Sequence, residues 1–188
     1  MIGNDKDAAV KDILYCKGFG EKMVRVRLRK MSEKEFEAFA EYSEKDYAND
    51  LMKSSEMPAE EAQRQAKKEF SELLPDGADT KDHSLRVIED TTDGRATGVI
   101  WYLFEMTDGV KQVFLNDFVI REEERRKGYA TAALAEMEQD ALRNGCMESI
   151  IYVWKHNLPG VKLYTKCGYV PFRDVNDGMY LKKQLHAG

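Results

Sequence analysis

The segment from Arg125 to Ala130 has the composition of an anion-binding turn. Two arginines, a lysine and Gly128 stand between an apolar run, Val113–Ile120, and a helix-forming stretch. The first backbone N–H groups of a helix have no intrahelical partners, and the helix dipole adds positive potential to them. A glycine here lets the backbone approach a bulky phosphate closely because it has no Cβ. The segment therefore predicts a binding site for a phosphate-bearing cofactor.

The pattern of this segment differs from two common nucleotide-binding loops. Neither the G-x-G-x-x-G fingerprint of dinucleotide-binding proteins nor the G-x-x-x-x-G-K-[ST] loop of nucleotide triphosphatases occurs in the chain. Arg125, Gly128 and Ala130 instead satisfy [Q/R]-x-x-G-x-[G/A]. In this respect the segment resembles the pyrophosphate-binding signature of the GNAT superfamily of N-acetyltransferases. The resemblance implies acetyl-CoA as the cofactor, used as acyl donor, with no metal.

A second block strengthens the resemblance. An apolar strand and Asn157 precede a short helix-forming stretch, Leu158–Tyr169, which ends in the pattern L-Y-x-x-x-G-[FY]. This order of strand, asparagine, short helix and aromatic ending is similar to the corresponding part of the family. In outline the resemblance runs from about Arg25 to Leu185, and its sharp motifs lie between Leu115 and Tyr169.

The resemblance implies where the cofactor binds. In the family, acetyl-CoA lies where two parallel strands splay apart, here Leu115–Ile120 and Ser149–Trp154. Strand groups left without partners would pair with the amide-rich pantetheine arm, and the loop amides would hold the pyrophosphate. The implied cofactor-binding residues are Phe118, Val119, Ile120, Arg125, Arg126, Lys127, Gly128, Tyr129, Ala130, Asn157 and Tyr164. From the residues alone, the basic segment also fits a solvated surface turn, and Asn157 fits a strand-end cap.

The chemistry implied is attack of an amine on a thioester. Tyr164 occupies the position of the family's general acid, and a phenol with an ordinary pKa of about 10 is protonated at neutral pH. The alternative for Tyr164 is a packing role. Asp117 is the candidate base and Glu105 the second candidate, although either carboxylate also suits an ion pair with a neighbouring lysine, and ordered water is a third way to remove the proton. His83 and His156 are further candidates, more typical of structural or exposed histidines.

The chain departs from the family pattern at two points. Gly160 stands where alanine is usual, after Pro159, and is expected to weaken the short helix modestly. Arg126-Lys127 stands in place of the commoner Gly-Lys.

Hydrophobic periodicity and turn residues predict the elements around these motifs. Ser32 and Glu35 form a capping-box pattern with Met31 and Phe36 as a hydrophobic staple. The expected helix faces include Phe39, Ser43, Tyr47 and Leu51, and then Ala62, Ala66, Phe70, Leu73 and Leu74. The expected strands are Met23–Leu28, Ser84–Glu89, Thr97–Glu105, Val113–Ile120, Ser149–Trp154, Val170–Val175 and Met179–Gln184. This order predicts an α+β fold with the GNAT topology: a mixed, mostly antiparallel seven-stranded sheet with one parallel βαβ crossover at the cofactor site and helices on both faces.

Composition limits the remaining choices. The 188 residues are 43% hydrophobic, enough for one domain, expected at residues 23–186 after an extension, 1–22, with a short helix over Asp7–Tyr15. The net charge of −5 argues against a nucleic-acid binder. Three scattered cysteines suit reduced thiols in the cytoplasm, and no run is long and apolar enough to cross a membrane.

The leading interpretation is an N-acetyltransferase that moves an acetyl group from acetyl-CoA to a primary amine of a small molecule or peptide by direct attack in a ternary complex. Its two N-terminal helices and the Asn176–Gly178 hairpin are expected to select the acceptor. Glu56, Glu60, Glu61 and Asp79 would suit a cationic acceptor, although a solvated helix face is the default interpretation. The alternatives are a catalytically silent acyl-CoA-binding or sensing domain of the same fold and a nucleotide-binding protein of another class. The sequence is also compatible with a homodimer.

Overall fold

The computed structural model describes residues 24–186. The expected extension, 1–22, with its helix over Asp7–Tyr15, lies outside the described residues. The elements, in chain order, are β1 (Val26–Lys30), α1 (Glu33–Ser55), α2 (Ala59–Leu73), β2 (His83–Asp90), β3 (Ala96–Thr107), β4 (Val110–Ile120), α3 (Tyr129–Arg143), β5 (Glu148–Trp154), α4 (Leu158–Lys166), β6 (Val170–Asp174) and β7 (Gly178–Gln184). Short 3₁₀ turns occupy Gly77–Asp79 and Glu122–Glu124.

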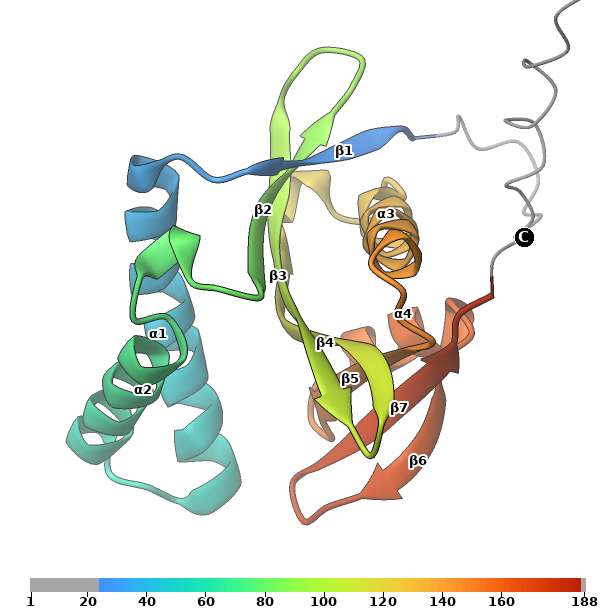
Figure 1. Ribbon diagram of the computed structural model, residues 1–188. Helices are drawn as coiled ribbons and strands as arrows, with labels where there is room; N and C mark the ends of the chain where they lie inside the picture. The colour runs from blue at the N-terminus through green and yellow to red at the C-terminus, as the bar shows by residue number, and fades with distance from the viewer. Residues whose placement is uncertain (1–23, 187–188) are drawn as a thin grey trace, which may run out of the picture.

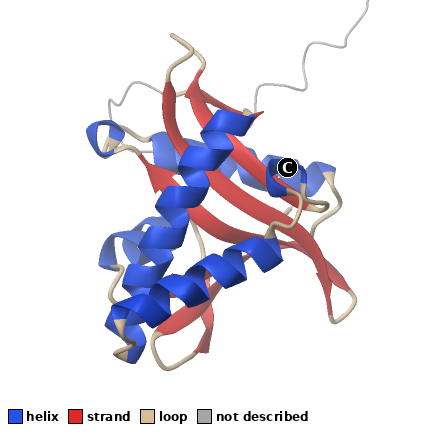
Figure 2. Cartoon of the chain, turned by 90° about the vertical axis from the view of Figure 1, so that its left-hand side faces the viewer, coloured by secondary structure: helices blue, strands red, loops and turns tan. Residues whose placement is uncertain are grey.

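One seven-stranded sheet organises the described chain in the order β1-β2-β3-β4-β5-β7-β6. Every neighbouring pair is antiparallel except β4 and β5, which run parallel and are joined through α3. The hairpin of α1 and α2 covers one face, and α3 lies on the other (Figure 1). Figure 2 looks onto the sheet from the side of that hairpin. The predicted α+β fold with a single parallel crossover is confirmed.

Two apolar layers enclose the sheet. The larger cluster joins α3 and α4 to one sheet face through residues such as Leu134, Met137, Val113 and Leu115. The second cluster joins the opposite face to α1 and α2, where Phe39 and Phe70 pack against Trp101 of β3 with ring centroids 6.2 and 5.6 Å away. The sheet therefore has a distinct set of neighbours on each face.

The capping box predicted at the start of α1 is present. The Ser32 hydroxyl accepts from the backbone N–H of Glu35, and the Glu35 carboxylate accepts from the backbone N–H of Ser32. Met31 and Phe36 belong to the same apolar cluster, as a hydrophobic staple requires.

Most strand ends differ from the sequence expectation by one to three residues, and two differences, one of length and one of burial, have a clear physical reason. β1 continues to Lys30, because its antiparallel ladder with β2 runs on to the pair Lys30 and Arg86, while Met23 lies outside the described residues. Leu73, expected on the buried face of α2, is 45% exposed, whereas Leu74 is buried. The helix ends at Leu73, so Leu74 leaves the helical path and turns inward.

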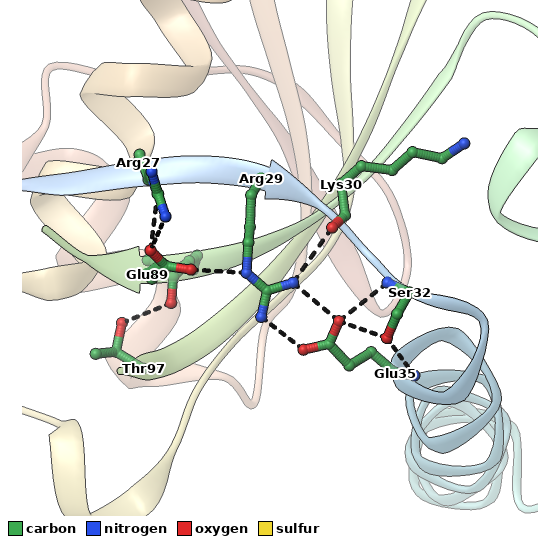
Figure 3. Close-up of polar contacts among 8 residues, drawn as sticks. Arg27, Arg29, Lys30, Ser32, Glu35, Glu89 and Thr97 are labelled. Atoms are coloured by element: carbon green, nitrogen blue, oxygen red, sulfur yellow. Dashed lines mark hydrogen bonds and ion pairs between the residues drawn. The ribbon is translucent and has the colours of Figure 1, made fainter. Parts of the chain in front are cut away.

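An ion-pair network ties the start of α1 to the sheet (Figure 3). Arg29 of β1 donates from Nε to Glu89 of β2 at 2.7 Å and from both Nη atoms to Glu35 of α1 at 2.9 and 2.6 Å. Hydrogen bonds from Arg29, followed by those from Ser32, lower the pKa of Glu35 to about 2. Arg27 also binds Glu89, at 2.7 Å, but its side chain is 66% exposed against 34% for Arg29. Arg29 is thus the bridge between sheet and helix.

None of the helices in residues 24–186 is long and apolar enough to cross a membrane. The same residues contain no group of three or more His, Cys, Asp or Glu side chains arranged to hold a metal ion.

We expect Arg29→Ala to lower the melting temperature by roughly 5 °C, because it leaves two carboxylates without their shared partner. Arg27→Ala is the matched control and should cost only about 1–2 °C, since the more exposed Arg27 contacts Glu89 alone. Because the pKa of Glu35 is lowered in the folded state, its contribution is complete above about pH 5 and is lost as pH falls toward 2. Thermal melts at pH 7 and pH 3 measure both effects. Equal losses for the two variants would contradict the bridging role.

Candidate active site

The parallel ladder between β4 and β5 stops halfway along both strands. Its register pairs run from Gln112 and Glu148 to Leu115 and Ile151. Beyond this point β4 continues to Ile120 on its ladder with β3, and β5 continues to Trp154 on its ladder with β7. The facing edges of the two strands therefore carry backbone N–H and C=O groups without cross-strand partners. Such edges accept an extended, amide-containing chain as an added strand.

An open cleft of about 1430 Å³ begins at this splay. Both strand ends line it, together with the loop before α3, the start of α4 and the inner faces of α1 and α2. The sequence-predicted residues in its lining are Asp117, Phe118, Val119, Ile120, Arg125, Arg126, Gly128, Tyr129, Ala130, Asn157 and Tyr164. The structure thus brings Asp117 and every predicted cofactor-binding residue except Lys127 into one lining.

A β-bulge in β4 determines which way Asp117 faces. Trp101 of β3 pairs with Asp117, but the next residue, Tyr102, pairs with Leu115, so Asn116 is an extra residue. In a strand of the same sequence without a bulge, regular alternation would direct Asp117 to the same side as Leu115, toward α3. With it, Phe118 joins the cluster of Leu115, and Asp117 lies opposite Trp101 on the face covered by α1.

Asp117 is a half-buried carboxylate with acidic neighbours. Burial, followed by the charges of Asp46 and Asp50, raises its pKa to about 6. Hydrogen bonds from the Ser43 hydroxyl and the backbone N–H of Phe118 act in the opposite direction. A group with a pKa of about 6 is mostly ionised at neutral pH and is a much better proton acceptor than an ordinary aspartate.

Tyr164 lies in α4, is buried, and lines the same cleft. Burial and then the charge of Asp117 raise its pKa, so the phenol keeps its proton throughout the neutral range. The phenol is thus protonated at neutral pH, which is the state that a general acid requires.

Asn157 caps the helix that carries Tyr164. Its Oδ1 accepts the backbone N–H of Gly160 at 3.0 Å, while its Nδ2 is a separate donor that this bond does not use. A Cβ on Gly160 would lie 2.8 Å from that Nδ2. Glycine in place of the usual alanine therefore leaves room for the Asn157 side chain, a packing reason that the sequence did not reveal.

The loop before α3 contains two residues in the left-handed conformation, Arg126 (φ 64°) and Gly128 (φ 93°). Arg125 donates from Nε to the Ile120 carbonyl at 3.1 Å, and Lys127 donates to Glu124 at 3.1 Å. Glu124 is buried and also binds Arg95. Lys127 is therefore paired with Glu124 and is absent from the cleft lining, and its part in cofactor binding stays a prediction. Arg126 is exposed and lines the cleft.

The other candidate residues lie outside the cleft lining. Glu105 accepts from Gln112 at 2.5 Å, and His83 accepts from the Trp101 indole at 2.8 Å. His156 is hydrogen-bonded to Asp50 at 2.9 Å and stacks on Trp154. The acidic residues considered for a cationic acceptor are also elsewhere: Glu56, Glu60 and Glu61 are exposed, and Asp79 pairs with Lys30. Their solvated interpretation is the better one.

Several lining residues were missed by sequence reasoning. On the helical-hairpin side they are acidic and aromatic: Tyr42, Ser43, Glu44, Asp46, Tyr47, Asp50 and Glu69. The opposite side carries basic residues, namely Arg125 and Arg126 in the loop and Lys162 and Lys166 in α4. Helical spacing places Ser43, Asp46, Tyr47 and Asp50 on one face of α1, which could have indicated a polar lining. The sequence analysis assigned only Ser43 and Tyr47 to this face, and as part of an apolar stripe. The cleft is thus acidic where α1 covers it and basic near the loop.

The family model of the Acetyltransferase (GNAT) family matches residues 45–169, a range that contains the splay, the loop and α4. This chain belongs to the GNAT acetyltransferase family. The uncharacterised N-acetyltransferase YycN of Bacillus subtilis (strain 168) is 32% identical over 144 residues, which are 77% of this chain and 92% of YycN.

Solved structures of other acetyltransferases agree with the fold. The crystal structure of YycN has a TM-score of 0.74 at 31% identity, covering 80% of this chain and 95% of that one. The PaiA N-acetyltransferase of Thermoplasma acidophilum, solved with coenzyme A, has a TM-score of 0.63 at 16% identity and covers 85% and 98% of the two chains. Spermidine N-acetyltransferase of Vibrio cholerae, solved with CoA and spermine, has a TM-score of 0.60 at 16% identity, covering 86% and 96%.

In this GNAT acetyltransferase, the left-handed backbone at Arg126 explains why glycine is the commoner residue at that position. We expect Arg126→Gly to raise the free energy of unfolding by up to about 1 kcal/mol, because glycine adopts positive φ without a Cβ penalty. Gly128→Ala is the opposing control and should lower it by about 1–2 kcal/mol. Chemical denaturation of both variants provides the measurement. A loss of stability in Arg126→Gly as large as that in Gly128→Ala would contradict the assigned loop conformation.

Proposed function

We infer that this protein is an acetyl-CoA-dependent N-acetyltransferase that transfers an acetyl group to a primary amine of a small molecule or peptide. The observation that carries the proposal is the splay of β4 and β5, at which Asp117, Tyr164 and the loop before α3 line a single cleft. A proton acceptor and a proton donor serve the proton transfers of this reaction, and an anion-binding loop suits a phosphate-bearing acyl donor.

The residues present fit acetyl-CoA. The unpaired edges of Phe118–Ile120 and of β5 match the amide-containing pantetheine arm. The backbone N–H groups at the start of α3, with Gly128 before them, would hold the pyrophosphate, and Arg126 would supply positive charge beside it. The Nδ2 of Asn157 would donate to a carbonyl of the arm.

Bound acetyl-CoA would supply the thioester carbonyl that the amine attacks and would depart as the thiol. Asp117 would take one proton from the acceptor ammonium and so free the nitrogen lone pair for attack. As the C–S bond breaks, Tyr164 would give its phenolic proton to sulfur and recover a proton from the amide nitrogen. The third ammonium proton stays on the product, so protons and charge balance. The burial that raises the pKa of Tyr164 also disfavours a free thiolate, which keeps this transfer feasible.

The acceptor would be positively charged. Glu44, Asp46, Asp50 and Glu69 line the α1–α2 side of the cleft, and the charges of Asp46 and Asp50 act on Asp117. Tyr42, Tyr47 and Tyr152 line it as well, and aromatic faces add cation–π attraction. An amine with a second cationic group would satisfy both Asp117 and these acids.

We expect Tyr164→Phe to lower turnover about 100-fold or more, because general acids contribute on that scale, while acetyl-CoA affinity changes less than about threefold. The assay is thiol release from acetyl-CoA with a panel of monoamines, diamines, polyamines, amino acids and peptides, alongside calorimetric titration with acetyl-CoA. Full turnover in the variant would remove Tyr164 from the mechanism. Acetyl-CoA binding without turnover on any amine would instead favour the catalytically silent binding domain.

We expect Asp46→Asn to raise KM for a diamine about 3- to 10-fold and to leave KM for a monoamine of similar length nearly unchanged. The loss corresponds to one partly screened Coulomb contact. Glu60→Gln is the matched control, since Glu60 is exposed on α2 and outside the cleft lining. Equal effects of the two substitutions would refute recognition of a second charge by α1.

A further inference from the structure

Ser43 is a buried hydroxyl in the middle of α1 whose bond joins that helix to β4. It is 5% exposed, and its Oγ donates to Oδ2 of Asp117, 74 residues further along the chain. Serine is a weaker helix former than alanine, since its side chain competes for backbone bonds. Its use in this helix is therefore explained by the bond it makes across to the strand.

The helix that carries Ser43 is held on both sides of it. The network of Arg29, Glu35 and Glu89 fixes the start of α1, and Phe39, one turn before Ser43, packs against Trp101. Seven residues after Ser43, Asp50 is bonded to His156 between β5 and α4. Trp101 is also the register partner of Asp117. The Ser43 hydroxyl is thus held in a defined position over the carboxylate.

Burial, followed by the charges of Asp46 and Asp50 on α1, opposes the ionisation of Asp117. Tyr42 of α1 and Tyr164 of α4 are close enough for the charge of Asp117 to raise their pKa values, so both phenols stay neutral and add no charge beside it. Two donors favour the carboxylate: the hydroxyl of Ser43 and the backbone N–H of Phe118. The N–H belongs to the strand itself, so Ser43 is the side-chain donor that favours the ionised form of this base.

We propose that Ser43 is a positioning residue for Asp117, whose hydroxyl keeps the carboxylate charged and oriented at the splay between β4 and β5. This inference rests on the proposed function, because it assigns a role in proton transfer from the acceptor. Ser43 does not touch the reacting atoms. Its hydrogen bond links the position of α1, which lines the proposed acceptor side of the cleft, to the ionisation of Asp117.

The experiment compares Ser43→Ala, Ser43→Thr and wild type by ¹³C NMR titration of aspartate carboxyl groups, with Asp117→Asn used to assign the resonance. Removing the hydroxyl should raise the pKa of Asp117 by roughly one unit, and threonine, which keeps the donor, should restore it. Ser43→Ala also improves helix propensity, so the variant is expected to fold, and circular dichroism checks this.

The acidic limb of kcat/KM with the best amine of the panel provides the second readout. It should move to higher pH in Ser43→Ala by the same amount as the NMR value and return in Ser43→Thr. Repeating the profile in His156→Gln excludes a limb that comes from the histidine bound to Asp50. A purely structural role would lower the rate equally at every pH.

Two failures are distinguishable. An unchanged Asp117 titration in Ser43→Ala overturns the proposal at the level of the hydrogen bond, whatever the activity. A shifted titration combined with full turnover in Asp117→Asn overturns it at the level of catalysis, and then the assignment of the base in the proposed function fails as well.

Discussion

The single extra residue in β4, at the point where the parallel ladder ends, determines the geometry of the whole site. Side chains of a regular strand alternate between the two faces of the sheet. A bulge places two residues opposite one, so every following side chain lies on the face opposite to the one that regular alternation would give it. Asn116 is that residue, and it directs Phe118 into the core beneath α3 and Asp117 toward α1. The ladder with β5 ends one residue earlier, at Leu115. The same short segment thus opens a strand edge and turns a carboxylate toward the opening, which neither feature achieves alone.

Local costs gather around this segment. The Nδ2 of Asn116 is buried without a hydrogen-bond partner, Asp117 has lost hydration, and Arg126 adopts a left-handed backbone. Each feature opposes folding, and such features persist only where the surroundings hold them. The surroundings here are substantial: the Arg29 bridge, the aromatic cluster on Trp101 and the buried Glu124 beneath the loop. The unfavourable features thus lie at the candidate site, and ordinary packing and ion pairing elsewhere in the fold offset them.

Sequence reasoning predicted the features that depend on local pattern and not those that depend on register. The capping box of Ser32, the turn around Gly128 and the strand–helix–strand order are written in short stretches, and the structure has them as expected. The bulge at Asn116 is invisible to periodicity, because it becomes defined only when β3 is aligned beside β4. The pairing of Lys127 with Glu124 was not predicted for the same reason: Glu124 is local, but its burial depends on packing across the sheet. Ser43 fitted an apolar stripe until a strand 74 residues away supplied its partner.

The division of charge within the cleft has a consequence for how the site would work. Asp46 and Asp50 disfavour the ionised form of Asp117, whereas a bound ammonium on the same side would favour it. By linkage, a group that ionises more readily when a cation is bound also binds that cation more tightly once ionised. An acceptor carrying positive charge would therefore increase the ionisation of Asp117, the carboxylate proposed to deprotonate it, and a neutral acceptor would not. The overall charge of −5 has no part in this coupling; the acids that α1 holds over the bulge of β4 provide it.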